Sequence, residues 1–295
     1  MSKKILQSKK KIFNYLLIGS NGLLGSKLKK LLPTNDLFCV AKKNSNYNIN
    51  LVNLKKLEKL FKKYRFLNVI NVAAITDLQV CQKKKNLCRK INFLLPLKLN
   101  ILSKKYNFKF VQISTDQVYV SSHKKENDEK DKIGFKNYYS KTKYLSEKGL
   151  KKNPKSLIIR TNFTGFKANK KRTFISWIDE SIKKKKKINL FNDLVCSTID
   201  VETCSKLIIK LIEKNKSGVF NLGTRDSLSK KNFAILYAKK LKKKIYYNDI
   251  SANKIILKRP LNLRLNVKKI EKTLGLKMIS SSQSINKLIL QKRYT

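Results

Sequence analysis

Residues 15–32 read YLLIGSNGLLGSKLKKLL and contain the pattern from which the architecture follows. A short β-rich run, YLLIG (15–19), leads directly into glycines at Gly19, Gly22 and Gly25 and then into the amphipathic stretch LLGSKLKKLL (23–32). The chain has only nine glycines, so this spacing has a chance expectation of about one in a hundred. It predicts a strand, a tight turn and the N-terminus of a helix.

Each glycine has a mechanical role in such a loop. Gly19 permits the tight turn, Gly22 lets backbone N–H groups approach a pyrophosphate, and Gly25 lets helix and sheet pack closely. The sequence therefore predicts a dinucleotide-binding loop made of Gly19, Asn21, Gly22, Leu23, Leu24 and Gly25.

The next predicted strand, LFCVA (37–41), lacks the acidic residue that usually binds a ribose 2′-hydroxyl at this corner. Lys42, Lys43 and Asn44 follow it instead. Cations there favour a 2′-phosphate, and hence NADP(H) over NAD(H), with NAD(H) left open as the alternative.

Short strands alternate with longer helical patterns through most of the chain. Further predicted strands are NVINVAA (68–74), FKFVQIS (108–114), SLIIR (156–160), KINLF (187–191) and GVFNLG (218–223). This alternation predicts an α/β protein with a Rossmann-like, doubly wound parallel sheet and a small, mostly helical C-terminal substrate lobe. We expect an NAD(P)-binding domain at 12–162, rejoined by about 188–223, and a substrate-binding lobe at 163–187 and 224–295.

Composition restricts the function. The chain has 295 residues, 41% of them hydrophobic, but no apolar run of membrane-spanning length and no signal-peptide pattern, so we expect a cytoplasmic protein without a membrane partner. Its five cysteines and single histidine, His123, form no zinc-ligand pattern, so no metal is expected, and a histidine-based catalytic triad is disfavoured.

The formal net charge of +51 points first to nucleic acid. However, only eight of the 69 basic residues are Arg, and the lysines are spread over every predicted helix instead of forming one stripe. We interpret them as solvated helix surfaces, and nucleic-acid binding is not expected to be the main function.

Polar side chains collect where two predicted strands end. Small residues, Ala73 and Ala74, end the third strand, and Ser114, Thr115 and Asp116 end the fourth. The segment NYYSKTKYLSE (137–147) then places Lys143 four residues after Tyr139, an arrangement that can depress the pKa of a phenol.

Lysine is so common that about two such Tyr–Lys pairs are expected by chance, and Tyr144 with Lys148 is the second. The positions of the two pairs on the predicted helix distinguish them. Tyr144 follows Tyr139 by five residues, a rotation of roughly 140° on a helix, so the second pair must face away from any site that Tyr139 faces.

Several blocks together resemble the extended short-chain dehydrogenase/reductase family, and within it the dTDP-4-dehydrorhamnose reductases and related sugar-nucleotide reductases. The blocks occur in the family's order over about residues 14–290: VINVAAITDLQVCQ, ISTDQVY, YYSKTKYLSE, LIIRTNFTGF, GVFNLGTRDSLSKKNFA and RPLNLRLNVKKIEKTLG. The resemblance implies reduction by NAD(P)H of the 4-keto group of a nucleotide-activated deoxysugar, in the synthesis of surface polysaccharide precursors.

The resemblance also implies roles for individual residues. Thr115, Tyr139 and Lys143 would be catalytic, with Tyr139 as general acid and Lys143 also on the nicotinamide ribose. Ser114, Thr115, Asp116 and Phe163 would meet the sugar, and Phe163 stands where the rhamnose enzyme has Trp. The remaining cofactor contacts would come from Asn50, where the family commonly has Asp, and from Leu51, Ala73, Ala74 and Ile75.

Other functions remain open on the sequence. A sugar-nucleotide 4,6-dehydratase is disfavoured because Gln117 stands where those relatives have the proton-transferring Glu. A 4-epimerase needs no such carboxylate. A non-catalytic, NADP-binding regulatory subunit, of the kind that binds methionine adenosyltransferase, shares the same blocks, and a homodimer is compatible with each of these functions.

Overall fold

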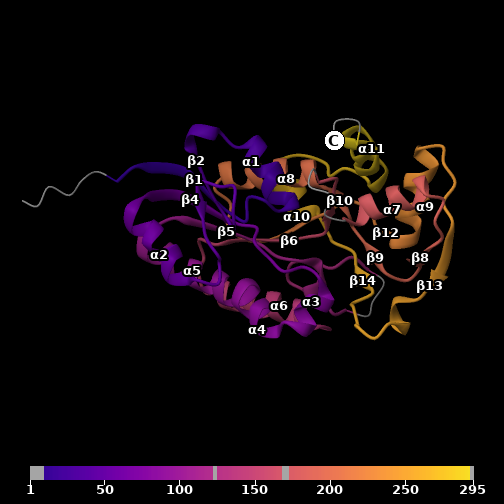
Figure 1. The fold of residues 1–295 in the computed structure, drawn as a ribbon, viewed down its shortest axis with the longest axis horizontal. Helices are drawn as coiled ribbons and strands as arrows, with labels where there is room; N and C mark the ends of the chain where they lie inside the picture. Colours follow the sequence, from indigo (N-terminus) through magenta and orange to yellow (C-terminus); the bar gives the residue numbers. More distant parts are fainter. Residues whose placement is uncertain (1–9, 122–124, 168–172, 293–295) are drawn as a thin grey trace, which may run out of the picture.

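The computed structural model describes residues 10–121, 125–167 and 173–292, so His123 lies outside the described residues. A seven-stranded parallel sheet forms the centre, in the order β11-β6-β5-β4-β1-β2-β3 (Figure 1). Its strands are β1 (Ile12–Ile18), β2 (Leu37–Ala41), β3 (Tyr47–Asn48), β4 (Arg65–Asn71), β5 (Lys109–Ile113), β6 (Leu157–Thr161) and β11 (Gly218–Leu222). The predicted Rossmann-like, doubly wound sheet is confirmed.

The direction of winding reverses between β1 and β4, because β2 and β3 extend the sheet on one side of β1 and β4, β5 and β6 extend it on the other. Ligands of open α/β sheets bind at such a switch point, outside the carboxyl ends of the strands. The topology therefore directs attention to the loops after β1, β4 and β5.

The strands are apolar because both faces of the sheet are covered. All five residues of β2 are buried, as are Leu16, Leu17 and Ile18 of β1. Near-continuous hydrophobic runs of this kind are typical of parallel strands between two helical layers.

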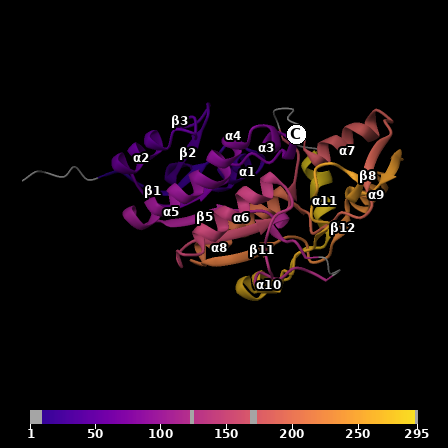
Figure 2. The same cartoon turned by 90° about the horizontal axis from the view of Figure 1, so that it is seen from below.

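Helices form a layer on each face of the sheet (Figures 1 and 2). One layer consists of α1 (Leu23–Leu31), α8 (Val201–Glu213) and α10 (Lys268–Leu274); the other of α2 (Leu54–Lys63), α5 (Leu95–Tyr106) and α6 (Tyr138–Leu150). In α2, Leu57, Leu60 and Phe61 fall on one face and are buried, and the Asn53 side chain caps the helix by accepting from Lys56 N at 3.0 Å.

The helical region between β4 and β5 is interrupted, but not at Pro96. The break lies at Lys84, whose φ of −114° and ψ of 56° separate α3 (Leu78–Lys83) from α4 (Lys85–Arg89). A π-helical segment, Lys90–Leu94, joins α4 to α5. Pro96 stands in the first turn of α5, where a missing N–H costs least.

A smaller group of elements lies beyond the carboxyl edge of the sheet (Figure 1). Its helices are α7 (Phe174–Lys183), α9 (Lys230–Lys240) and α11 (Ser281–Lys292), packed around a separate apolar core that includes Ile178, Phe233 and Ile285. Its strands are β7 (Phe163–Thr164), β8 (Ile188–Phe191), β9 (Val195–Cys196), β10 (Ile199–Asp200), β12 (Leu228–Ser229), β13 (Tyr247–Ile250) and β14 (Asn262–Leu263).

Within the segment 188–223, which the sequence places back in the large domain, only β11 joins the central sheet. β8 pairs with β13 in the small group instead. α8 packs against α1, and α10 from the C-terminal segment packs on β11. The division of the chain into 12–162 and the substrate-binding lobe stays a proposal. No helix in the described part of the chain is both long and apolar enough to span a bilayer.

Candidate active site

The glycine loop joins β1 to α1 at the switch point. Gly19 has φ +92°, and a Cβ there would lie 2.8 Å from the backbone nitrogen of Ala73; a Cβ on Gly25 would lie 2.2 Å from the carbonyl oxygen of Gly19. Both glycines are therefore required by the packing of the chain itself.

Gly22 differs from the other two glycines. A Cβ there would meet only the carbonyl oxygen of Gly19, at 3.3 Å. Gly22 is the N-cap of the nine-residue α1, no side chain caps that helix, and Gly22 lines the pocket described below. A helix N-terminus carries partial positive charge and presents backbone N–H groups, so this arrangement fits the pyrophosphate of a dinucleotide.

The outer corner of the loop carries the expected cations. Asn21 donates from Nδ2 to the carbonyl oxygen of Lys43 at 2.6 Å, which holds the loop against the end of β2. Lys42 and Lys43 are exposed, as is Asn50, whose Oδ1 accepts from Val52 N at 3.3 Å. These residues and Leu51 lie outside the pocket, on the side where the sequence places the adenosine half of a cofactor.

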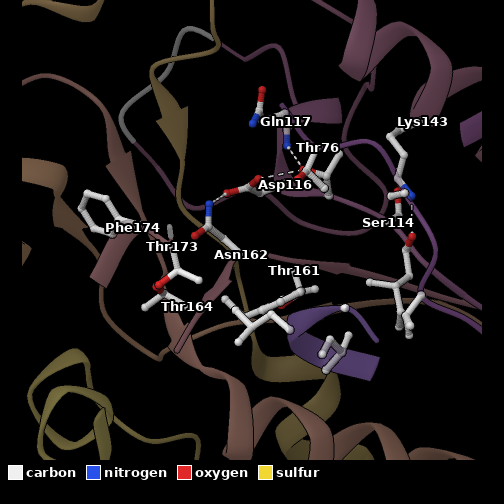
Figure 3. A pocket seen from close by; sticks show the side chains of 18 of the residues that line it. Thr76, Ser114, Asp116, Gln117, Lys143, Thr161, Asn162, Thr164, Thr173 and Phe174 are labelled. Atoms are coloured by element: carbon white, nitrogen blue, oxygen red, sulfur yellow. Dashed lines mark hydrogen bonds between the residues drawn. The ribbon is translucent and has the colours of Figure 1, made fainter. Parts of the chain in front are cut away.

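A pocket of about 470 Å³ opens in front of α1 and the ends of β4, β5 and β6 (Figure 3). Lys143 and Ser114 lie at one end and Phe174 with Thr173 at the other, while Asp116 and Asn162 lie between them. The expected site residues that line it are Gly22, Leu23, Leu24, Gly25, Ala74, Ser114, Thr115, Asp116, Tyr139, Lys143 and Phe163.

Three further expected cofactor contacts do not line the pocket. Gly19 and Ala73 pack against each other behind the loop. Ile75 packs against the apolar cluster around Tyr139. Its backbone N–H donates to Asn92 Oδ1 and its carbonyl oxygen accepts from Asn92 Nδ2, both at 2.9 Å. Thr76, the next residue, lines the pocket instead.

Sequence reasoning missed several lining residues, namely Val72, Thr76, Ile113, Gln117, Thr161, Asn162, Thr164, Lys167, Thr173 and Phe174. Asn162 directly follows β6, so the rule that found Ser114 and Thr115 at the end of β5 could have found it too. Thr173 and Phe174 come from the small group of elements, and no local pattern indicates them.

Tyr139 and Lys143 project from the start of α6. A capping box between Asn137 and Ser140 fixes where this helix begins. Both side chains are buried, with 7% of Tyr139 and 3% of Lys143 exposed. Lys143 donates from Nζ to the carbonyl oxygen of Ile113 at 2.6 Å, so its ammonium lies at the end of β5.

Burial dominates the ionisation of both groups. It lowers the pKa of Lys143 to about 8, while the charges of Glu147 and Cys88 oppose that change. Burial raises the pKa of Tyr139, and a hydrogen bond with the Thr115 hydroxyl opposes the rise. The expectation that Lys143 depresses the pKa of Tyr139 is therefore wrong for the protein alone, because the cost of placing a phenolate in this buried site dominates.

Thr115 and Asp116 form the central part of the pocket wall. The Thr115 hydroxyl donates to Asp116 Oδ1 at 3.1 Å, and Asn162 Nδ2 donates to Asp116 Oδ2 at 2.8 Å. Burial raises the pKa of Asp116 to about 6, although these hydrogen bonds and the charge of Lys230 oppose it. Asp116 can therefore change its protonation state close to neutral pH.

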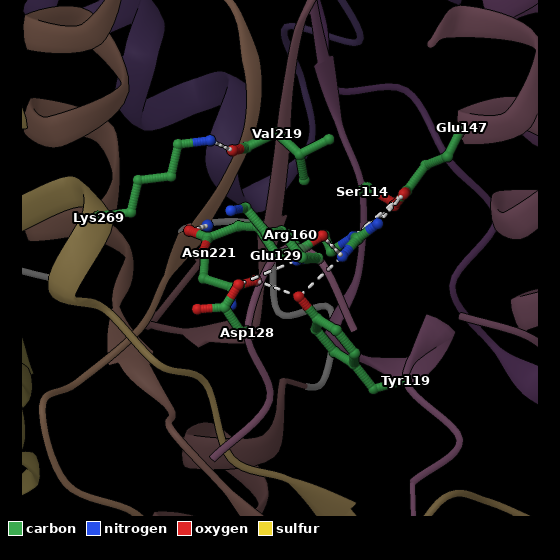
Figure 4. A network of polar contacts seen from close by, with 10 residues as sticks. Ser114, Tyr119, Asp128, Glu129, Glu147, Arg160, Val219, Asn221 and Lys269 are labelled. Atoms are coloured by element: carbon green, nitrogen blue, oxygen red, sulfur yellow. Dashed lines mark hydrogen bonds and ion pairs between the residues drawn. The ribbon is translucent and has the colours of Figure 1, made fainter. Parts of the chain in front are cut away.

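A buried ion pair anchors α6 one turn beyond Lys143, through Glu147 on the same side of the helix (Figure 4). Arg160 on β6 donates to Glu147 Oε2 from Nε at 3.0 Å and from Nη2 at 2.8 Å, and it reaches Tyr119 Oη from Nη1 at 2.8 Å. Ser114 Oγ donates to Glu147 Oε1. This network ties the helix that carries Tyr139 and Lys143 to the strand end that carries Thr115.

The second Tyr–Lys pair lies outside the pocket, as its rotation about α6 predicts. Tyr144 packs against Phe135 with ring centroids 5.7 Å apart, and Lys148 Nζ lies 6.0 Å from the centre of the Tyr144 ring.

The fold and the pocket define the class of protein: an oxidoreductase of the short-chain dehydrogenase/reductase type, with a hydroxyl residue, a Tyr and a Lys beside a glycine loop at a helix N-terminus. A family model described as "RmlD substrate binding domain" matches residues 13–293. The chain therefore belongs to that family.

Individual relatives are similar over most of their length. A probable low-salt glycan biosynthesis reductase, Agl14, of Haloferax volcanii is 22% identical over 227 residues, which are 73% of this chain and 76% of the relative. A dTDP-4-dehydrorhamnose reductase from Bacillus anthracis, solved in complex with NADP, has a TM-score of 0.86 at 22% identity and covers 96% of this chain and 99% of its own. A hypothetical dTDP-4-dehydrorhamnose reductase from Sulfolobus tokodaii has a TM-score of 0.81 at 25% identity, covering 91% and 97%.

Proposed function

We propose that this protein reduces the 4-keto group of a nucleotide-activated deoxysugar with NADPH, in the synthesis of deoxysugar precursors for surface polysaccharides. The observation that carries the proposal is the meeting of Gly22 at the N-terminus of α1 with Thr115, Tyr139 and Lys143 in one pocket. Family membership and the reductases among the relatives support the same reaction.

The chain has groups suited to each part of the cofactor. The N-terminus of α1 would hold the pyrophosphate, Lys42 and Lys43 would favour a 2′-phosphate, and Lys143 would hydrogen-bond the nicotinamide ribose. The reduced nicotinamide supplies hydride when bound. NADP(H) is favoured on these grounds over NAD(H), and the Bacillus anthracis structure contains NADP.

The protein's own residues would manage the proton and the carbonyl group. Tyr139 is the proposed general acid, giving its phenolic proton to the oxygen at C4. Thr115, whose hydroxyl proton would turn from Asp116 Oδ1 to the substrate, would hold that oxygen in place, with Ser114 beside it. The raised pKa of Tyr139 keeps the phenol protonated before reaction, and the positive charge of the oxidised nicotinamide would stabilise the phenolate afterwards.

Substrate selection is assigned to the wall between β6 and α7. Asp116 and Asn162 present hydrogen-bonding groups to sugar hydroxyls, and Phe163 and Phe174 offer ring faces. The surrounding lysines would attract the anionic diphosphate of the substrate.

The cytoplasm is the proposed location, supported by five cysteines that are all free thiols. A homodimer remains an expectation for light scattering to test.

The test offers NADPH or NADH to the purified full chain with a panel of 4-keto-6-deoxy nucleotide sugars. We expect NADPH to be consumed in step with formation of a C4 alcohol. Inversion at C4 without net loss of NADPH would establish an epimerase instead. Tight NADPH binding with no turnover of any sugar would indicate the regulatory-subunit function.

A further inference from the structure

Two cysteines lie together directly beside the Tyr139 side chain. The sulfur atoms of Cys81 on α3 and Cys88 on α4 are 2.7 Å apart and share a hydrogen bond. Both side chains are fully buried, in the same apolar cluster as Tyr139. They are free thiols, and neither has a role in the proposed reduction.

The two sulfur atoms have different hydrogen-bonding partners. Asn92 Nδ2 lies 3.2 Å from Cys88 Sγ, and the Thr142 hydroxyl lies 3.6 Å from it. Cys81 Sγ instead donates to the carbonyl oxygen of Ile75 at 3.3 Å. Cys88 thus accepts from the Asn92 amide, while Cys81 faces the Ile75 carbonyl, an acceptor.

Because their surroundings differ, the two thiols have different pKa values. The contacts of Cys88 with Cys81, Thr142 and Asn92, and the charge of Lys143, lower the pKa of Cys88 against the effect of burial, while the contact with Cys88 and burial raise the pKa of Cys81. A stabilised thiolate next to a protonated thiol is the arrangement of a reactive cysteine with its resolving partner.

The other three cysteines lack these features. Burial raises the pKa of Cys39, of Cys196 to about 11 and of Cys204 to about 12. Buried cysteines in apolar surroundings are inert, so these three cysteines serve as unreactive controls for oxidation of Cys81 and Cys88.

The segment that carries the pair is suited to brief opening. α3 has six residues and α4 has five, and helices this short have little stability of their own. All residues from 82 to 87, between the two cysteines, are exposed. Local opening of such segments costs much less than global unfolding, so a small oxidant can reach sulfurs that are buried in the closed form.

We propose that Cys81 and Cys88 are a modification site, forming a reversible disulfide beside Tyr139 in response to peroxide. The Cys88 thiolate attacks one peroxide oxygen, which breaks the O–O bond and gives a sulfenic acid and hydroxide. Cys81 sulfur then attacks Cys88 sulfur, the S–S bond forms, and the sulfenic oxygen leaves as water with the Cys81 proton. Two thiols lose two electrons, hydrogen peroxide becomes two waters, and a small dithiol reverses the change.

The test treats the full-length protein with hydrogen peroxide, removes the peroxide, unfolds the protein, alkylates the remaining free thiols and digests with trypsin. Cleavage after Lys83, Lys84, Lys85 and Arg89 separates the two cysteines, so a disulfide joins the peptide ending at Lys83 to the peptide 86–89. We expect this linked pair by mass spectrometry, its loss after dithiothreitol, and full alkylation of Cys39, Cys196 and Cys204. Full alkylation of Cys81 and Cys88 after peroxide would overturn the proposal, as would oxidation of all five cysteines to similar extents.

Single variants assign the two roles. In Cys81→Ser, Cys88 should accumulate as a sulfenic acid that dimedone traps; in Cys88→Ser, oxidation of Cys81 should slow at least about tenfold, since its thiol stays protonated. Cys204→Ser is the matched control and should form the linked peptides at the wild-type rate. Undiminished oxidation of Cys81 in Cys88→Ser would contradict the assignment. None of these readouts needs turnover, so they stand or fall independently of the proposed reductase activity.

Discussion

Asp116 shows how the pocket sets the behaviour of a single side chain. The carboxyl is fully buried and touches Thr115 and Asn162, and burial raises its pKa to about 6. A pKa above the unfolded value means that the ionised form is disfavoured in the folded state. The resulting loss of stability is absent below about pH 4, appears as the pH rises through 6, and is complete near pH 7.

We therefore expect Asp116→Asn to increase the free energy of unfolding at pH 7 by about 1–3 kcal/mol, since each pKa unit corresponds to about 1.4 kcal/mol. The gain should vanish near pH 4. Urea unfolding at both pH values measures this gain. The control is Glu126→Gln at an exposed position, which should change the free energy of unfolding at neither pH. If Asp116→Asn stabilised the protein less at pH 7 than at pH 4, this explanation of the carboxyl would be contradicted.

At the scale of elements, α1 and α6 hold the two halves of the site. The glycines of the loop before α1 are not equally constrained, because a Cβ at Gly22 would meet only the Gly19 carbonyl oxygen at 3.3 Å, whereas a Cβ at Gly19 or Gly25 would approach backbone atoms within 2.8 Å or less. A residue retained without a packing reason at a helix N-terminus is expected where a ligand approaches the backbone closely.

Gly22→Ala should consequently fold with little change in stability and bind NADPH at least about tenfold more weakly, which corresponds to about 1.4 kcal/mol. Gly25→Ala should lower the free energy of unfolding by about 1–3 kcal/mol through overpacking against the Gly19 carbonyl. Calorimetric titration and thermal unfolding measure the two effects. Equal NADPH affinity in Gly22→Ala and wild type would remove the assignment of this loop to the pyrophosphate.

The junction of α6 with β6 depends on the buried Glu147–Arg160 pair, whose side chains are 1% and 0% exposed. Removing one partner of a buried pair leaves the other charge uncompensated, so Glu147→Gln should lower the free energy of unfolding by about 3–5 kcal/mol. The double variant Glu147→Leu/Arg160→Met should lose less than the single one. For the exposed pair Glu180–Lys184, Glu180→Gln should change stability by less than about 0.5 kcal/mol. Additive losses in the double variant would show that the two charges do not interact.

At the scale of the whole molecule, the excess of lysine creates a diffuse positive electrostatic field. The net charge of +51 attracts anions of any kind and is screened over about 10 Å at 0.1 M salt. A nucleotide-sugar diphosphate should therefore be captured faster at low ionic strength.

Raising the salt concentration from about 50 mM to about 300 mM should lower kcat/KM by about tenfold, while kcat at saturating substrate stays constant. Steady-state kinetics at several salt concentrations measures both quantities. A kcat/KM that does not depend on salt would show that the lysines have no part in substrate capture.

The sequence predicts those parts of the site that local pattern determines. Gly22 follows from glycine spacing, and Thr115 and Tyr139 follow from their places after a strand and at the start of a helix. Phe174 was missed because the small lobe brings it to the pocket through long-range packing. The same holds for β8, whose local pattern indicates a strand but does not identify β13 as its partner. For the protein without cofactor, the pKa of Tyr139 moves opposite to the predicted direction, because spacing reports a neighbouring charge but not burial.

The central claim is that Tyr139 gives the proton in a ketone reduction. Turnover of NADPH with a 4-keto sugar nucleotide, measured for Tyr139→Phe against wild type, tests it most directly. Because the phenolic hydroxyl is the only group removed, we expect kcat to fall by about 10²–10⁴-fold with unchanged NADPH affinity, whereas Tyr144→Phe, five residues further along the same helix, retains wild-type turnover. Wild-type turnover by Tyr139→Phe would contradict the account.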